Sequence, residues 1–254
     1  MDGLALAALA GVAAGAMNAL AGGGSFVSLP ALIAIGLPSV AANATSTVAL
    51  FPGGLAGAWV YRAGLKPVGR ASLAGLLSAS LAGGLVGGIA LLVTPGRVFD
   101  RLLPWLLLVA TVALAAGPSV RAALARRGRA PAGAPMLLAA QFALGIYGGY
   151  FGGAVGLMMM AAWSLLAESD LGRLQAARTA MVSAANLMSV AVFAMAGLVA
   201  WPQALALGAG ALVGGYAGAH LGRRLPGRAL RIGTLVFCAA MTALFFIREY
   251  FPAR

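Results

Sequence analysis

Charged residues are scarce in this sequence. Only 17 basic and 5 acidic residues occur among 254, a charged fraction of 9%, whereas soluble domains carry about 25%. Hydrophobic residues make up 62% of the chain and the mean hydropathy is +0.98. This composition excludes a water-soluble globular enzyme and a disordered chain. It predicts an all-α polytopic membrane protein whose apolar segments leave no room for a soluble domain.

Side chains that catalyse reactions, bind metals or carry protons are also few. The one cysteine, Cys238, excludes an intramolecular disulfide and a paired-cysteine metal site, and the one histidine is His220. All five acidic residues lie near the ends of apolar segments, so a cation pathway or a carboxylate proton relay has little support. No phosphate-binding loop, metal-ligand cluster or catalytic triad is present. We therefore expect neither an enzyme nor a bound cofactor.

Ten apolar segments account for most of the chain. They are predicted at residues 3–21, 25–36, 40–62, 69–93, 98–120, 135–151, 154–167, 174–199, 202–221 and 229–247. Residues 121–134 carry four arginines and are predicted to form a basic cytoplasmic linker. This linker divides the chain into a first transmembrane repeat, residues 1–120, and a second, residues 135–254.

The two halves share an ordered series of residues. Early in each half the offset is 134, so that Gly22 pairs with Gly156 and Thr45 with Thr179; later the offset falls to 131. Basic residues follow the third segment and precede the eighth, so the positive-inside rule makes the third run inward and the eighth outward. The sequence therefore predicts two inverted-topology repeats with both termini periplasmic.

An inverted repeat needs an odd number of crossings in each half. Five full spans satisfy this condition, and so do three spans preceded by a re-entrant hairpin of two short segments. The second segment has only about 11 apolar residues, too few to cross a bilayer at about 1.5 Å per residue. We therefore favour the hairpin.

The first candidate site is the glycine-rich break after the first segment. Its members are Asn18, Gly22, Gly23, Gly24 and Ser25. Three successive glycines interrupt a helix, and exposed backbone inside a membrane survives only in protein or beside a wet cavity. Free amides at such a break favour an anion. The alternative is a tight turn between helices without a ligand.

Hydroxyl groups gather at the start of the third segment. Thr45 and Ser46 follow Asn43 there, and we consider two roles equally supported. They either donate hydrogen bonds to an oxyanion, or they cap the helix and bond its own carbonyls.

The second half has a degenerate copy of these features. Gly149, Gly152 and Gly153 open its hairpin, and Arg178 stands beside Thr179 on the eighth segment, with Asn186 further along. An arginine inside a membrane segment is costly and generally functional, and its fork suits a bidentate oxyanion. The alternatives are that Arg178 extends to the interface and that Asn186, with Ser183 beside it, joins helices together.

Glycines also recur at four-residue spacing. Gly210, Gly214, Gly218 and Gly222 form one such ladder and Gly145, Gly149 and Gly153 another. This spacing is typical of helices that pack closely in membranes.

Several stretches taken together are typical of one known family. They comprise residues 15–25, 29–30, 36–38, 42–46 and 61–62 in the first half and residues 145–152, 186–189 and 197–201 in the second. They resemble the sulfite exporter (TauE/SafE) family, also called the toluene-sulfonate uptake permease family. The resemblance implies a permease of the bacterial inner membrane for small sulfur-containing or organic anions such as sulfite, thiosulfate, sulfoacetate and other sulfonates. The second half departs from the family pattern, since Arg178-Thr179-Ala180 replaces a second Ala-x-x-Thr-Ser.

These observations predict a permease that moves a small anion by alternating access. Backbone amides at residues 22–25 and 149–153 would cradle the anion, Thr45 and Thr179 would donate hydroxyls, and Arg178 would supply the countercharge. The expected partners are a small anion and the lipid bilayer, not nucleic acid, and the oligomeric state stays open. One alternative is a passive anion channel. Another is a membrane subunit or intramembrane enzyme, for which only His220 or Cys238 is available.

Overall fold

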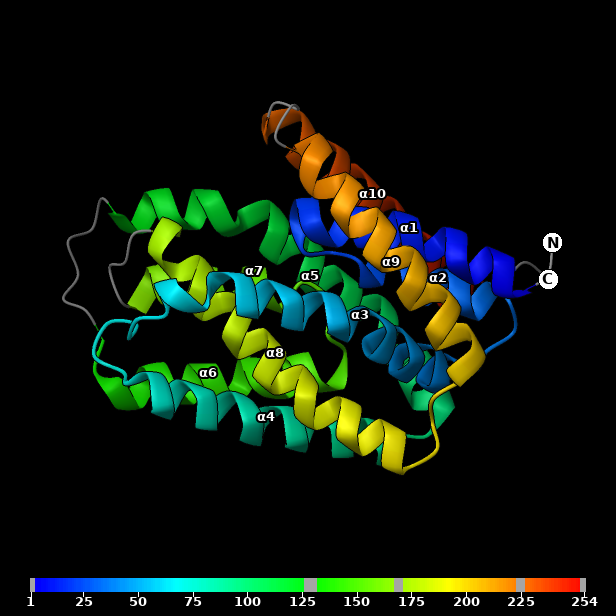
Figure 1. Cartoon of the computed structure of the whole chain (residues 1–254), viewed down its shortest axis with the longest axis horizontal. Coiled ribbons are helices and arrows are strands. Elements are labelled where there is room, and N and C mark those ends of the chain that lie inside the picture. Colours follow the sequence, from blue (N-terminus) through cyan, green and yellow to red (C-terminus); the bar gives the residue numbers. More distant parts are fainter. Residues whose placement is uncertain (1–2, 126–131, 167–170, 223–226, 252–254) are drawn as a thin grey trace.

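The computed structural model describes residues 3–125, 132–166, 171–222 and 227–251 (Figure 1). These ranges fold into ten α-helices and one short 3₁₀ helix. The α-helices are α1 (Gly3–Ala21), α2 (Ser25–Ala34), α3 (Ser39–Tyr61), α4 (Leu73–Val93), α5 (Gly96–Ala125), α6 (Ala134–Tyr150), α7 (Val155–Leu166), α8 (Leu171–Met195), α9 (Trp201–Gly222) and α10 (Gly227–Tyr250). The predicted all-α fold and its ten apolar segments are confirmed. Helix α5 extends into the predicted basic linker, of which residues 126–131 lie outside the described part.

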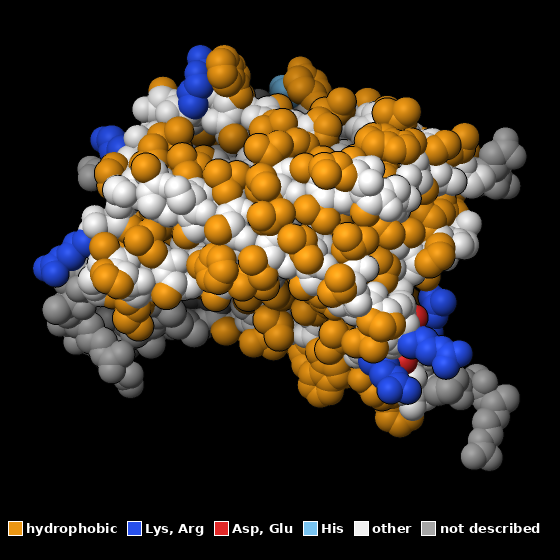
Figure 2. All heavy atoms as spheres, turned by 90° about the horizontal axis from the view of Figure 1, so that it is seen from below, with side chains coloured by type: hydrophobic (Ala, Val, Ile, Leu, Met, Phe, Trp, Pro, Cys, Tyr) orange, Lys and Arg blue, Asp and Glu red, His pale blue; other side chains and the backbone are white. Residues whose placement is uncertain are grey.

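Six of the described helices are long and apolar enough to cross a membrane on their own. They are α1, α4, α5, α8, α9 and α10. Hydrophobic side chains cover a broad band of the surface in Figure 2, and Lys and Arg side chains gather towards the ends of the molecule. The chain is therefore a multi-pass membrane protein. The polar first half of α3 keeps that helix out of the six, and its side chains are buried in protein.

The first two helices form a hairpin. A Cβ added to Gly3, at the start of α1, would lie 3.9 Å from Cβ of Ile35, just beyond the end of α2. The chain thus returns to the level at which it began. With 10 residues, α2 rises only about 15 Å, half of the hydrocarbon core. This geometry favours a re-entrant hairpin over two full spans.

Helices α6 and α7 form a second hairpin of the same kind. The backbone amide of Ala132, before α6, donates to the carbonyl of Leu166 at the end of α7 over 2.7 Å. Helix α7 has 12 residues, again too few to span. Both hairpins precede a long helix, α3 in one case and α8 in the other.

The hairpin turns use left-handed backbone at matching places. Gly22 follows α1 with φ +72°, and Gly152 follows α6, after Phe151, with φ +77°. Only glycine adopts this conformation without strain. These two turn glycines are 130 residues apart, whereas the predicted offset of 134 pairs Gly22 with Gly156, which lies inside α7. At the hairpin turns, the matching glycines are therefore four residues closer in the sequence than the predicted offset of 134.

Glycines hold three pairs of helices in backbone contact: α1 with α9, α4 with α6, and α4 with α8, where a Cβ on Gly84 would overlap the carbonyl of Ala185. A Cβ on Gly210 or Gly214 of α9 would overlap the carbonyl oxygens of Ala8 or Val12 of α1. A Cβ on Gly87 of α4 would likewise overlap a carbonyl of α6, and one on Gly83 would lie 2.8 Å from Cα of Gly145. The predicted packing role of both glycine ladders is confirmed at these positions, since only hydrogen fits between the backbones.

A buried polar cluster lies beside this second pair. The amide nitrogen of Gln141 on α6 donates to Ser80 of α4 over 2.8 Å, and the indole of Trp163 on α7 donates to the amide oxygen of Gln141 over 3.1 Å. All three side chains are fully buried. Because each has a partner, the cluster ties α4, α6 and α7 together and offers no free group to a ligand.

Candidate functional site

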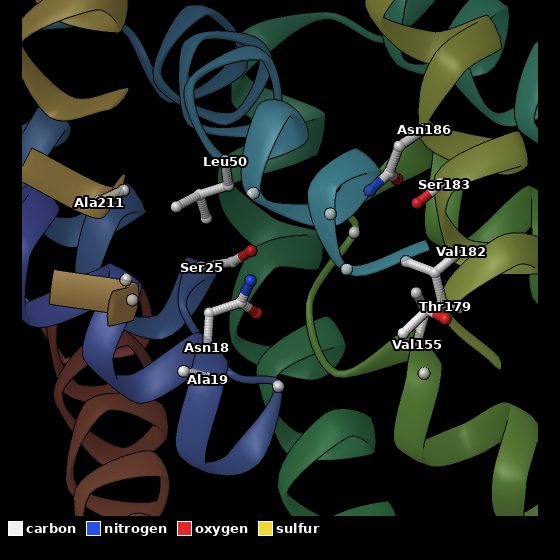
Figure 3. A pocket seen from close by; sticks show the side chains of 18 of the residues that line it. Asn18, Ala19, Ser25, Leu50, Val155, Thr179, Val182, Ser183, Asn186 and Ala211 are labelled. Atoms are coloured by element: carbon white, nitrogen blue, oxygen red, sulfur yellow. The ribbon is translucent and has the colours of Figure 1, made fainter. Parts of the chain in front are cut away.

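A cavity of about 420 Å³ lies between the turns of the two hairpins and helices α3, α8 and α9. Figure 3 shows α8 on one side of it, with Asn18 and Ser25 of the first hairpin opposite. The wall from α9 is apolar, with glycine, alanine and leucine side chains. The polar lining residues are Asn18, Ser25, Thr47, Tyr61, Gln175, Arg178, Thr179, Ser183 and Asn186.

Helix α8 supplies most of these polar groups because of its period. Arg178, Val182 and Asn186 follow one another at intervals of four, and Gln175, Thr179 and Ser183 form the neighbouring row. Residues four apart share a face of an α-helix. One face of α8 therefore presents a guanidinium, hydroxyls and amides to the cavity.

Arg178 is the cation of the cavity. A Cβ added to Gly156 of α7 would lie 3.3 Å from Cδ of Arg178, so the aliphatic part of the side chain lies over that glycine. Its Nη1 lies 3.9 Å from the place where a Cβ on Gly22 would be. No carboxylate among the described residues forms an ion pair with it. The guanidinium therefore faces the turn of the first hairpin with its charge uncompensated by that part of the chain.

Two further polar atoms in the cavity wall are buried without a hydrogen-bond partner. They are Oγ of Ser183 and Oδ1 of Asn186. Ser183 is 5% exposed, and its hydroxyl points into the cavity in Figure 3. A buried polar atom left unpaired costs about 1–3 kcal/mol. The Ser183 hydroxyl is thus free to donate to an anion beside the cation, whereas Oδ1 of Asn186 is an acceptor and can bond only to a donor.

The two threonines of the cavity differ from Ser183 in having partners. Thr179 donates to the carbonyls of Gln175 and Ala176 over 3.1 and 3.0 Å, and Thr47 donates to the carbonyl of Asn43 over 2.9 Å. Their hydroxyl protons are engaged in their own helices. Toward a ligand these hydroxyl oxygens can therefore act only as hydrogen-bond acceptors and as part of the cavity wall.

About half of the site residues predicted from the sequence line this cavity. Those that do are Asn18, Gly22, Ser25, Gly152, Arg178, Thr179 and Asn186. Those that do not are Gly23, Gly24, Thr45, Ser46, Gly149 and Gly153. The first group comes from both halves of the chain and meets around Arg178.

Thr45 and Ser46 of α3 lie outside the cavity and form hydrogen bonds to other parts of the fold. Thr45 accepts a hydrogen bond from the backbone amide of Ala200, in the α8–α9 connection, over 3.0 Å. Ser46 shares a hydrogen bond of 2.6 Å with Ser28 of α2. Thr45 and Ser46 are fully buried, so this structure has them joining helices.

The remaining predicted glycines serve the hairpins. A Cβ on Gly24 would come within 2.7 Å of the carbonyl of Ala14, so this residue lets the turn pack on α1. Gly149 packs against α4, and Gly153 lies under the ring of Phe151. Close approach of neighbouring backbone accounts for glycine at positions 24 and 149, and close approach of the Phe151 ring accounts for it at position 153.

Several cavity residues have no distinguishing pattern in the sequence. Gly53, Gly54 and Gly57 of α3 line the cavity. From the sequence, Gly53 next to Pro52 predicts only a kink in the helix. Their missing side chains leave the space in front of α8, where a Cβ on Gly54 would lie 3.6 Å from Oγ of Ser183. A comparison of the helical periods of α3 and α8 would have found this pairing.

The two groups that an enzyme would need lie outside the cavity. Cys238 is 1% exposed within the hydrophobic core, and His220 is an exposed residue of α9 whose ring contacts Tyr216. Neither lines the cavity. The cavity therefore contains groups for binding an anion, and its described part has no nucleophile paired with a base.

Substitutions at two serines of α8 are expected to affect either ligand binding or thermal stability, but not both. We expect Ser183→Ala to weaken anion binding about three- to tenfold, because a donor is lost from the cavity, with little change in thermal stability. Ser189→Ala should do the reverse, since Ser189 donates to the carbonyl of Gly84 in α4 over 3.0 Å. Binding isotherms and melting curves of both variants in detergent would check this. Equal effects of the two variants on binding would contradict it.

Comparisons with known proteins point in one direction. The family described as "Sulfite exporter TauE/SafE" matches residues 7–245. A Haemophilus influenzae protein named "Probable membrane transporter protein" is 28% identical over 221 residues, covering 87% of this chain and 86% of that protein. The Escherichia coli K12 "Probable membrane transporter protein YfcA" is 27% identical over 212 residues, covering 84% and 76%. A Sinorhizobium protein, "Probable membrane transporter protein ORF9", is 26% identical over 218 residues, covering 85% and 82%. No solved structure matches the chain.

Proposed function

The chain belongs to the sulfite exporter TauE/SafE family of membrane transporters, and from this premise we propose that it is a permease for a small sulfur-containing oxyanion or organosulfonate. The substrate binds in the cavity around Arg178. Sulfite, thiosulfate and sulfoacetate are the kinds of anion we expect. The protein works in the bacterial inner membrane.

One observation carries this proposal. Arg178 lies in a cavity inside a membrane protein with no carboxylate partner among the described residues. A buried cation needs an opposite charge nearby, and an anionic substrate supplies it. Ser183, Asn186, Asn18 and Ser25 surround the same space with hydrogen-bonding groups.

Alternating access is supported by where the cavity ends. On α3 its lining runs from Thr47 to Tyr61, which is 46% exposed, whereas Asn43 to Ser46 are buried and outside it. The cavity therefore opens towards the end of the molecule at which Arg62, Lys66 and Arg70 follow α3. The positive-inside rule assigns this end to the cytoplasm and both termini to the periplasm.

Two inverted repeats are supported by the paired hairpins. Helices α1 and α2 precede α3 as α6 and α7 precede α8, and α1 packs on α9 as α6 packs on α4. Such repeats enclose a midplane site that opens to each side in turn. The offset of 130 between Gly22 and Gly152 gives the register of this correspondence at the hairpin turns.

The test of the proposal is uptake of labelled sulfite into proteoliposomes of purified protein. We expect saturable uptake, inhibited by at least one of thiosulfate, sulfoacetate or another sulfonate and not by a cation. Counterflow driven by unlabelled substrate would identify a carrier and exclude a passive channel. Absence of saturable flux with every sulfur anion and with simple carboxylates would overturn the proposal.

A further inference from the structure

The two hairpin turns each face a polar side chain from the other half of the chain. At the second turn, the amide nitrogen of Asn43 on α3 donates to the carbonyl of Tyr150 over 2.9 Å. At the first turn, Nη1 of Arg178 on α8 lies 3.9 Å from the Cβ position of Gly22. Asn43 and Arg178 both lie on the helix that follows a hairpin, α3 after the first and α8 after the second.

The two turns differ in whether the facing side chain is bonded to them. Tyr150 is the last residue of α6, and the last carbonyls of an α-helix have no partner within the helix. Asn43 satisfies one of them and is 1% exposed. Arg178 stands at the end of α1 in the same way, but among the described residues it makes no hydrogen bond.

This difference coincides with the closed and open ends of the cavity. The end at Asn43 is closed, and the bonds from Thr45 to Ala200 and from Ser46 to Ser28 add to the seal. The end at Arg178 is open, and Tyr61 and Ala219 line it. The bonded turn is therefore on the closed side, and the unbonded turn is on the open side.

We propose that Arg178 is also a gate residue, which closes the inner side of the cavity by donating to the backbone carbonyls at the end of α1, as Asn43 closes the outer side at α6. This proposal rests on the permease function. In the outward-open state the Asn43–Tyr150 bond breaks and Arg178 caps α1. The guanidinium then alternates between the anion and the helix end, so that the same group binds substrate and closes the gate.

The test measures access to the cavity with no anion present. Ala49 lines the cavity and is 5% exposed, and the one native cysteine, Cys238, is buried. A chain carrying Ala49→Cys therefore reports cavity access through a membrane-impermeant maleimide. The reagent is applied to intact cells for the outer side and to inside-out vesicles for the inner side. The chain without Ala49→Cys gives the background.

The two gate variants should shift access in opposite directions. Asn43→Ala should raise the ratio of outer to inner labelling about tenfold, and Arg178→Ala should lower it about tenfold, because each removes a bond present in one state only. If Arg178 only binds substrate, its removal leaves the ratio unchanged without an anion. An unchanged ratio, or a shift of both variants in the same direction, would overturn the proposal.

A third variant separates the gate from the anion site. Arg178→Gln keeps N–H donors for the end of α1 but removes the charge. We expect its labelling ratio to stay near that of the reporter chain while anion flux is lost. Should Arg178→Ala fail to accumulate in the membrane, Arg178→Met, which retains bulk without a donor, takes its place. Failure of the permease function would appear in the flux assay, and failure of the gate only in labelling.

Discussion

Arg178→Ala is expected to lower the transport efficiency for the anion roughly 100-fold, because charge-assisted hydrogen bonds to a desolvated anion are the strongest contacts in the cavity. Arg178→Lys keeps the charge but not the planar fork, so a loss of about tenfold is expected. The measurement is the initial rate of labelled anion uptake into proteoliposomes as a function of concentration. Equal amounts of reconstituted protein are required for each variant.

Arg62 is the matched control for this experiment. It lies at the same end of the molecule, just beyond α3, where its guanidinium donates to the carbonyl of Trp59 over 2.7 Å and stacks 4.0 Å above the indole ring. It does not line the cavity. Arg62→Ala should leave the transport efficiency within about twofold, since exposed contacts of this kind contribute little. If both arginine variants lose transport equally, the effect reflects general surface charge and not the cavity.

Gly214→Ala is expected to prevent normal assembly of the helices. The added Cβ would overlap the carbonyl oxygen of Val12 and lie 2.7 Å from its Cα, so α1 and α9 must separate. Overpacking a rigid core costs about 1–3 kcal/mol, and backbone atoms cannot turn aside as side chains do. We expect a lower melting temperature and a loss of monodisperse protein in size-exclusion chromatography. The substitution adds one methyl group and leaves charge and hydrogen bonds unchanged.

The next residue supplies the control for this prediction. Gly215 lies on the cavity side of α9, and the nearest atom to an added Cβ is the carbonyl oxygen of Gly15 at 3.8 Å. Gly215→Ala should fold normally and keep the melting temperature of the parent, since alanine favours helix over glycine by up to about 1 kcal/mol. Similar destabilisation by both substitutions would show that helix flexibility, not backbone contact, requires glycine here.

The helices were predictable because the apolar runs are long and are broken by glycine, proline and arginine. The second segment is too short to span by its sequence alone, and α2 has 10 residues. Arg178 is a candidate by its sequence alone, because a lone charge in a membrane segment has few structural uses. These features depend on composition and length, which the sequence states directly.

The face on which a polar residue lies was not predictable in the same way. Thr45, Ser46 and Thr47 are adjacent, yet only Thr47 lines the cavity, because successive residues of a helix point about 100° apart. Thr45 faces the α8–α9 connection and Ser46 faces α2. Without the tilt and neighbours of α3, the sequence offers no reason to choose among three hydroxyls.

The position of the two hairpin turns was not predictable from the repeat offset for a related reason. Glycines occur so often that a shift of four residues, about one helical turn, still places glycine opposite glycine in α1 and α6. The left-handed backbone at Gly22 and Gly152 marks where the two hairpins turn, and that conformation depends on where each helix ends. Arg178 has no such ambiguity, because no second charged residue lies one helical turn away from it in the described part of α8.

The glycine contacts also determine which parts of the molecule can move. Helix α1 belongs to the first half of the sequence and α9 to the second, yet their backbones touch; α4 and α6 are joined across the halves in the same way. The two sequence halves are therefore interlocked and cannot swing apart as separate lobes. Any large motion has to divide the chain differently, keeping α1 with α9, and keeping α4 with both α6 and α8.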